Sequence, residues 1–244
     1  MLLIGNGRLL TRDQGNYIEN GAVAIEGNLI LEVGETAKLK QKYPEAEWID
    51  ADDGVIMPGL VNTHNHIYSA FARGLSIKGY NPHDFNDILE GMWWKIDRLL
   101  TKENDSLSAQ AVYIDCIKNG VTTVFDHHAS YLDIPGSLDT IADAAKALGV
   151  RTSLCYEVSD RDGKAKMTEA VLENERMILR ANADDSDMLK GMMGLHAAFT
   201  LSDETLALCK KHTPSYTGAH IHVAEGPGDQ IDSLHKYGKR IVER

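Results

Sequence analysis

The spacing of apolar residues along the chain changes near residue 55. Before that point, apolar runs at residues 22–25 and 29–33 are separated by polar, turn-forming positions. Three dipeptides of the hairpin type occur there: Asn6-Gly7, Asn20-Gly21 and Gly27-Asn28. Such dipeptides favour tight turns between antiparallel strands. The pattern predicts that residues 1–54 form the N-terminal part of a small β-sandwich.

From Val55 onward, short apolar runs alternate with helical stretches. The apolar runs cover residues 55–62, 121–126, 150–156, 192–197 and 219–224, and the helical stretches cover 102–119, 136–148, 168–182, 203–212 and 230–243. Gly120 and Gly149 are suitable helix stops, and Ser202 is a suitable N-cap. Apolar strands that alternate with helices predict a parallel sheet covered by helices.

Residues 55–244 contain five such β/α units, and several of their strands end in chemically active side chains. Barrels of the (β/α)8 type carry their sites at the carboxyl ends of the strands and take about 250 residues. The expected fold class is therefore α/β, with the first five β/α units of a TIM-like (β/α)8 metal-dependent hydrolase barrel. This barrel would be truncated at residue 244 and would follow the N-terminal segment.

The first apolar run ends in P-G-L-V-N-T-H-N-H, which places His64 and His66 two residues apart at the end of a strand. Residues at this spacing point to the same side of a strand. Both imidazoles could then bind one ion, and neutral imidazole suits Zn, Fe, Ni or Cu. An isolated H-x-H pair is often only two surface histidines, but its place at a strand end favours a metal site.

A second histidine pair ends the fifth run, in the segment A-H-I-H-V-A-E, where Glu225 follows His222 by three residues. A metal ion lowers the pKa of a bound water to about 7. A nearby glutamate then serves as general acid and base. The alternative is a buried histidine pair, His220 and His222, followed by a helix-capping glutamate.

These two motifs together resemble those of the amidohydrolase superfamily, in its cytosine deaminase, S-adenosylhomocysteine deaminase and chlorohydrolase branch. The wider sequence is most similar to the SsnA-type aminohydrolases, which are associated with selenium metabolism. The similarity spans essentially the whole chain. The resemblance implies that His64, His66 and His222 are metal ligands and that Glu225 is the proton-shuttling glutamate.

The resemblance also bears on residues around this centre. His196 matches a substrate-contacting position, with a core histidine as the alternative, and His220 would support the site rather than bind metal. The family takes a further histidine and an aspartate from later strands, beyond Arg244. The bridging lysine of dinuclear members has no counterpart at the end of the fourth strand, because Lys190 lies at its start. One metal ion is therefore expected.

Two other places could line the site. His127, in the run Asp126-His127-His128, could contact substrate or orient a metal ligand, or it could make only local hydrogen bonds. Trp93 and Trp94 lie after the first strand, where loops often form lids. Helix packing or a dimer contact is the alternative for these two aromatic residues.

These features predict a metal-dependent hydrolase that acts on a C–N bond other than a peptide bond, by deamination of a heterocyclic small molecule. The cofactor would be one divalent transition metal, with Zn preferred and Fe(II) as the second choice. A chlorohydrolase-type hydrolase and a non-catalytic metal-binding fragment are the alternatives. Because the aspartate of the eighth strand is missing, this chain alone is expected to be inactive.

Composition and charge limit the classes of molecule that this chain is expected to bind. The chain has 244 residues, of which 43% are hydrophobic and 25% charged, as in ordinary globular proteins. A net charge of -11 argues against nucleic acid as a partner. No apolar run reaches the ~18 residues of a membrane span and no basic leader is present, so a cytoplasmic location is expected. The sequence leaves open whether the chain forms a homo-oligomer.

The three cysteines, Cys116, Cys155 and Cys209, lack paired spacing and are expected to be buried thiols.

Overall fold

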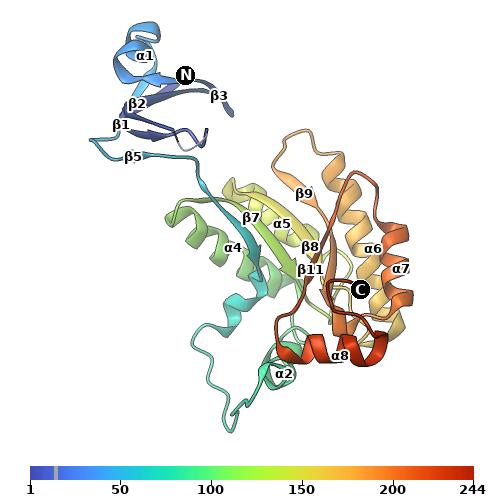
Figure 1. The fold of residues 1–244 in the computed structure, drawn as a ribbon. Coiled ribbons are helices and arrows are strands. Elements are labelled where there is room, and N and C mark those ends of the chain that lie inside the picture. The colour runs from blue at the N-terminus through green and yellow to red at the C-terminus, as the bar shows by residue number, and fades with distance from the viewer. Residues whose placement is uncertain (14–15) are drawn as a thin grey trace. The chain divides into compact units, whose positions relative to one another are not determined.

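The computed structural model describes residues 1–13 and 16–244, which divide into two compact units, Met1–Gly59 and Leu60–Arg244 (Figure 1). The first unit is built on a five-stranded sheet in the order β3-β2-β1-β4, with β5 beside β1. The strands are β1 (Leu2–Leu10), β2 (Tyr17–Glu26), β3 (Leu29–Glu35), β4 (Glu47–Asp50) and β5 (Val55–Ile56), and helix α1 covers Thr36–Lys42. Strands β1, β2 and β3 are antiparallel, whereas β4 and β5 run parallel to β1.

Only one of the three predicted hairpin dipeptides forms a turn. Gly27-Asn28 joins β2 to β3, but the other two dipeptides lie inside β1 and β2, so those two predictions were wrong. Asn6 takes a left-handed φ of 59° where the register between β1 and β2 shifts. Asparagine tolerates this conformation, and the Asn6 side-chain amide donates to Asp50 at 2.7 Å. The dipeptide Asn6-Gly7 therefore marks a strand irregularity.

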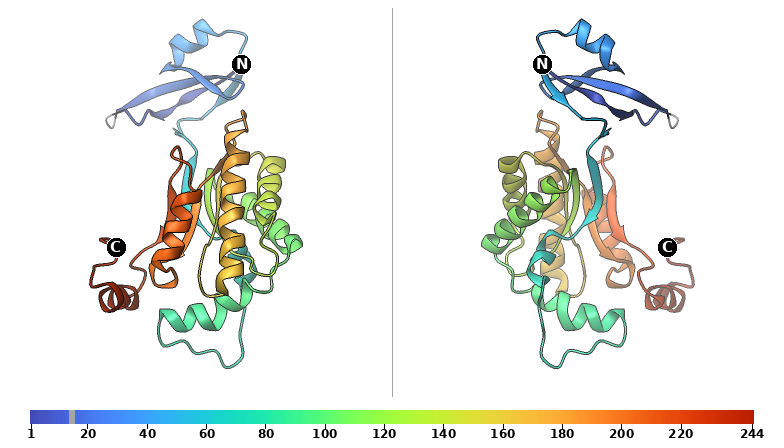
Figure 2. Two further views of the ribbon diagram at one scale, coloured as in Figure 1. Left: turned by 90° about the vertical axis from the view of Figure 1, so that its right-hand side faces the viewer. Right: turned by 90° about the vertical axis from the view of Figure 1, so that its left-hand side faces the viewer.

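The second unit alternates strands and helices, as the apolar pattern predicts. Parallel strands β6 (Leu60–Asn65), β7 (Val121–His128), β8 (Arg151–Tyr156) and β9 (Leu189–Gly191) form one sheet in that order, and β10 (Met193–Ala197) pairs in parallel with β11 (Ala219–His222). The connecting helices are α4 (Lys102–Lys118), α5 (Ser137–Leu148), α6 (Gly163–Asn182), α7 (Asp203–His212) and α8 (Pro227–Tyr237). Figures 1 and 2 show α4, α5, α6 and α7 arranged along the outside of these strands.

The two parallel sheets of this unit meet through β8 and β10. Val158 and Leu195 form an isolated parallel bridge, and the His196 N–H donates to the Val158 carbonyl at 2.9 Å. Gly194 permits the close approach, since a Cβ at this position would lie 2.2 Å from the carbonyl oxygen of Tyr156. The Asn174 side chain of α6 accepts from both the Tyr156 N–H and the Gly194 N–H.

Helix ends follow local chemistry where a capping residue is present. Helix α7 begins after Ser202, whose hydroxyl accepts from the Thr205 N–H at 3.2 Å, as predicted. Helix α6 begins at Gly163 rather than at Thr168. Helix α8 ends at Tyr237 rather than at residue 243, because Gly238 takes a left-handed φ of 63° and caps it.

The main core of the second unit lies between its strands and helices α4, α5 and α6. Its fully buried side chains include Tyr113, Leu138, Ile141, Leu154 and Met177. The three cysteines are free and buried, as predicted. Within the described part of the chain, no helix is both long and apolar enough to cross a membrane.

The segment after β6 is made of short helical pieces. These are η1 (Ile67–Ala72), α2 (Phe85–Ile88), the π-helical turn η2 (Leu89–Trp93) and α3 (Trp94–Ile96). They contribute Tyr68, Phe85, Trp93 and Trp94 to a cavity at the carboxyl ends of the strands.

Candidate metal centre and cavity

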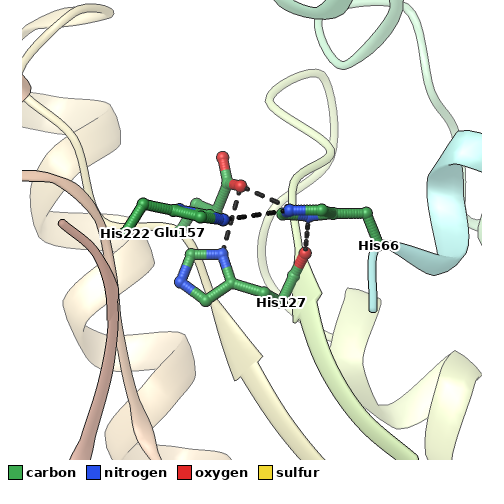
Figure 3. Close-up of side chains that lie close together, drawn as sticks. All are labelled: His66, His127, Glu157 and His222. Carbon is green, nitrogen blue, oxygen red and sulfur yellow. Dashed lines mark hydrogen bonds and ion pairs between the residues drawn. The ribbon is translucent and has the colours of Figure 1, made fainter. Parts of the chain in front are cut away.

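Three imidazoles converge at the carboxyl ends of β6 and β11. The Nε2 atom of His222 lies 3.0 Å from Nε2 of His66 and 3.2 Å from Nε2 of His64. His66 and His222 approach each other from opposite sides (Figure 3). The structure thus brings together the three residues that the sequence motifs propose as metal ligands.

Hydrogen bonds to backbone carbonyls fix the orientation of two of these rings. Nδ1 of His66 donates to the carbonyl of His127, and Nδ1 of His222 donates to the carbonyl of His196, both at 2.7 Å. In a neutral imidazole that carries its proton on Nδ1, Nε2 presents a lone pair. Burial lowers the pKa of His66 to about 3, so this ring is neutral near pH 7.

In the tautomer that carries its only ring hydrogen on Nδ1, each of these two rings directs the lone pair of Nε2 toward the other ring across 3.0 Å. Two lone pairs at this distance repel unless a cation lies between them. Metal-bound histidines commonly donate their other ring N–H to a carbonyl in this way. A tetrahedral Zn²⁺ with Zn–N bonds of about 2.0–2.1 Å separates its nitrogen ligands by about 3.3 Å, so the donor set fits a small transition-metal ion.

His220 contacts a proposed ligand from the side. Its Nε2 lies 2.8 Å from Nδ1 of His64. Burial lowers the pKa of His220 to about 4. This contact with the second ring nitrogen of His64 fits the supporting role expected for His220.

A second grouping overlaps this one. Ligand atoms of His66, His127, Glu157 and His222 lie within 4.8 Å of one another (Figure 3). However, Nε2 of His127 faces the carbonyls of Leu195 and His220, at 3.1 and 3.2 Å, and its Nδ1 faces Glu157 at 3.1 Å. Both nitrogens of His127 therefore face oxygen acceptors, which leaves this ring without a free nitrogen that could bind an ion.

Glu157, which follows β8, is a residue of the site that the sequence analysis missed. It is only 2% exposed, and its carboxylate lies 3.1 Å from Nδ1 of His127, 3.6 Å from Nδ1 of His66 and 3.9 Å from Nε2 of His196. Burial alone would raise the pKa of Glu157, but the surrounding imidazoles hold it well below its usual value. A carboxylate directly after an apolar strand was the signal that could have identified it.

A cavity of about 350 Å³ opens above the imidazoles. Its wall includes Trp93 and His196, two of the three residues proposed as substrate contacts. The third, His127, is fully buried and lies outside the lining. The other lining residues are Asn65, Tyr68, Ser69, Phe85, Leu89, Trp94, Glu157 and Glu225, together with His64, His66 and His222.

Glu225 borders this cavity from the turn after β11. Burial raises its pKa; His222 opposes this shift, and the nearby acids Asp229 and Glu157 add to it. The Glu225 N–H donates to the carboxylate of Asp229 at 3.2 Å, which fixes the turn at the start of α8. The side chain is thus placed at the cavity with a proton affinity above that of an ordinary glutamate.

Comparison with known proteins places this geometry in context. A model of the amidohydrolase family matches residues 55–244, and a model of the imidazolonepropionase-like composite domain of bacteria matches residues 21–46. The chain is 30% identical over 244 residues to a 5'-deoxyadenosine deaminase of Methanosarcina barkeri, covering 99% of this chain and 53% of that protein. It is 27% identical over 237 residues to a 5-methylthioadenosine/S-adenosylhomocysteine deaminase of Bacillus cereus, covering 95% and 51%.

Among solved structures, the fold is similar to that of an atrazine chlorohydrolase from Arthrobacter aurescens complexed with zinc. The TM-score is 0.79 at 23% identity, over 100% of this chain and 57% of that one. This likeness confirms the predicted α/β barrel fold class. The chain spans about half the length of the curated relatives that it matches.

Proposed function

This chain belongs to the amidohydrolase family, and on that premise we propose that it is part of a metal-dependent hydrolase that deaminates a heterocyclic small molecule. The observation that carries the proposal is the convergence of three Nε2 atoms at an aromatic cavity. The Nε2 atom of His222 lies 3.0 Å from that of His66 and 3.2 Å from that of His64. A glutamate with a raised pKa borders the same cavity. This combination supplies a cation site, a proton carrier and a flat apolar wall.

One divalent transition metal would be held by His64, His66 and His222, with Zn²⁺ as the first choice and Fe²⁺ as the second. The zinc in the similar chlorohydrolase supports this choice. When bound, such an ion supplies a Lewis acid that lowers the pKa of a water molecule.

Glu225 would move the proton of the reaction. Its carboxylate accepts a proton from the attacking water and returns it to the departing nitrogen, which must be protonated to leave as ammonia. General acid–base groups work best when their pKa is close to the working pH. The raised pKa of Glu225 is in the right direction for this role.

The cavity wall would hold the substrate ring. Tyr68, Phe85, Trp93 and Trp94 present aromatic surface, and aromatic rings attract flat heterocycles in stacked or edge-on arrangements. The names of the similar deaminases refer to adenosine derivatives, which supports a substrate with an amino group on such a ring. His196, whose Nδ1 lies 2.8 Å from Oγ1 of Thr200, would contact that substrate with Nε2.

A chlorohydrolase reaction is the second candidate, because the fold is similar to that of an atrazine chlorohydrolase. The two reactions differ in their leaving groups, and chloride leaves without a proton. Dependence on Glu225 as a proton donor therefore favours deamination. A link to selenium metabolism is proposed on the sequence resemblance alone. A cytoplasmic location is proposed as the default for a chain whose apolar runs are too short to span a membrane.

The test is Glu225→Gln in the active enzyme, assayed for ammonia and chloride release from a panel of amino- and chloro-substituted purines, pyrimidines and triazines. Glutamine has nearly the same shape but cannot carry the proton, so we expect unchanged metal content and a rate that falls by about 10²–10⁴-fold. Glu204→Gln, at an exposed position of α7, is the matched control and should leave the rate unchanged. Deamination at the wild-type rate by Glu225→Gln would contradict the proposal.

A further inference from the structure

The proposed metal ligands come from two different sheets. His66 follows β6, which pairs with β7, whereas His222 ends β11, which pairs with β10. The two residues are 156 positions apart in the chain. A three-histidine site therefore needs something that holds the first sheet at a fixed distance from the second.

The side chain of His127 spans this gap. It extends from β7 in the first sheet, and its Nε2 lies 3.1 Å from the carbonyl of Leu195 on β10 and 3.2 Å from the carbonyl of His220 on β11. Its Nδ1 lies 3.1 Å from the Glu157 carboxylate, which follows β8. The ring is fully buried, so water does not compete for these contacts.

The two ring nitrogens of His127 face acceptors only. A hydrogen on Nε2 is shared between the two carbonyls, and one proton lies between Nδ1 and the Glu157 carboxylate. Hydrogen bonds in which one partner is charged are shorter and about twice as strong as neutral ones. The imidazole is thus fixed at both ends, with one end on each sheet.

Backbone carbonyls of the strands that His127 connects also orient the rings of the proposed metal ligands. The carbonyl of His127 accepts from Nδ1 of His66, and the carbonyl of His196, next to Leu195, accepts from Nδ1 of His222. The same strand segments that His127 connects therefore orient the rings of His66 and His222. A change in the spacing of the sheets would move both Nε2 atoms.

We propose that His127 and Glu157 form an interior tie that holds the two sheets at the spacing at which His66 and His222 share one metal ion. They are positioning residues, not ligands. The inference rests on the metal site of the proposed function, and it adds a role for two residues that need not touch the ion.

The test measures Zn²⁺ affinity by competition with a chromophoric chelator, and uses the visible absorption of bound Co²⁺ as a signature of ligand geometry. Loss of residues that orient metal ligands typically weakens binding 10–100-fold. We expect a loss of about 100-fold for Glu157→Ala and about 10-fold for Glu157→Gln, because the glutamine amide oxygen can still accept a hydrogen bond from Nδ1 but lacks the charge of the carboxylate. The Co²⁺ spectrum should change in both variants.

His127→Ala should weaken binding by a similar factor, and His127→Ala combined with Glu157→Ala should add little more. Residues that act as one unit are not additive. Circular dichroism establishes that each variant is folded. Where His127→Ala does not fold, the comparison of Glu157→Gln with wild type decides.

The matched control is Asp105→Ala, which removes a fully buried carboxylate that pairs with the next histidine of β7, His128, at 3.5 Å. Zn²⁺ affinity within twofold of wild type in this variant supports the tie. Equal losses in Asp105→Ala and Glu157→Ala, or wild-type affinity in the Glu157 variants, would overturn it. Absence of Zn²⁺ binding to the wild-type protein would instead overturn the metal site itself.

Discussion

His127 and His128 are neighbours on β7, and both are fully buried, yet they serve opposite sides of the strand. His127 points to the side where Glu157 and the carbonyls of β10 and β11 lie. His128 points to helix α4, where its Nε2 lies 3.5 Å from Asp105, and it also contacts Ser130 at 2.9 Å. Each imidazole has one carboxylate partner, so residue type and burial do not distinguish them.

The difference lies in what each pair connects. The His127–Glu157 pair lies at the ends of β7 and β8 and contacts β10 and β11, the second of which carries the proposed ligand His222. The His128–Asp105 pair joins β7 to the covering helix α4. Adjacent residues in a strand point to opposite faces, so one step along the chain separates a role in the site from a role in packing. Changes on the inner side should therefore alter metal binding, and changes on the outer side should alter stability.

The largest effect is expected for a ligand on the inner side. Wild-type protein should hold about one equivalent of metal, because three imidazoles and one open position suit a catalytic ion. His222→Ala removes the nitrogen that faces both His64 and His66, and should abolish this content in elemental analysis after dialysis. His235→Ala, at an exposed position of α8, is the control and should retain it. Two metal ions per chain in the wild type would argue for a dinuclear site.

An intermediate effect is expected on the outer side. Asp105→Ala leaves His128 buried without its carboxylate, and breaking a buried pair typically costs about 3–5 kcal/mol. We expect the free energy of unfolding, measured with urea, to fall by about 3 kcal/mol. Asp115 lies on the same helix α4 and forms a half-exposed ion pair with Arg73. Asp115→Ala removes this pair and should lower the free energy of unfolding by less than about 1 kcal/mol. If Asp105→Ala and Asp115→Ala lower the free energy of unfolding equally, the buried pair stabilises the fold no more than the half-exposed pair does.

The smallest effect concerns pH. Burial alone would lower the pKa of His128, but Asp105, Asp126 and Glu157 outweigh it and raise this pKa above 6.5. A raised pKa means that the folded protein holds this proton more tightly than the unfolded chain. The stability that His128 contributes is therefore fully present below pH 6.5, and is lost as the pH rises through the raised value.

The pH prediction can be separated from other titrations by comparison with Asp105→Asn. This substitution removes the nearest charge that raises the pKa, so the decline in unfolding free energy above pH 6.5 should become shallower. Urea unfolding at a series of pH values from 6 to 9 measures both slopes. Identical slopes for the two proteins would show that Asp105 does not set the protonation of His128.

Local sequence features predicted much of the second unit. The strand–helix alternation, the Ser202 cap and the three buried thiols are all found in the structure. Errors occurred where a local signal had two structural meanings. The dipeptide Asn6-Gly7 suits a hairpin turn and a strand bulge equally well, and pairing with β2 and β4 selects the bulge.

The sequence alone determined that His64 and His66 lie on the same side of the strand that the structure shows as β6, because the two-residue period of an extended chain is a local property. It also determined the family, through motifs at two strand ends. Only the tertiary structure decided that His127 faces inward and His128 outward, and that Glu157 lies among three imidazoles. These facts depend on which strands become neighbours, and the contacts of the His127 ring join residues between 30 and 93 positions apart, beyond the reach of any local pattern.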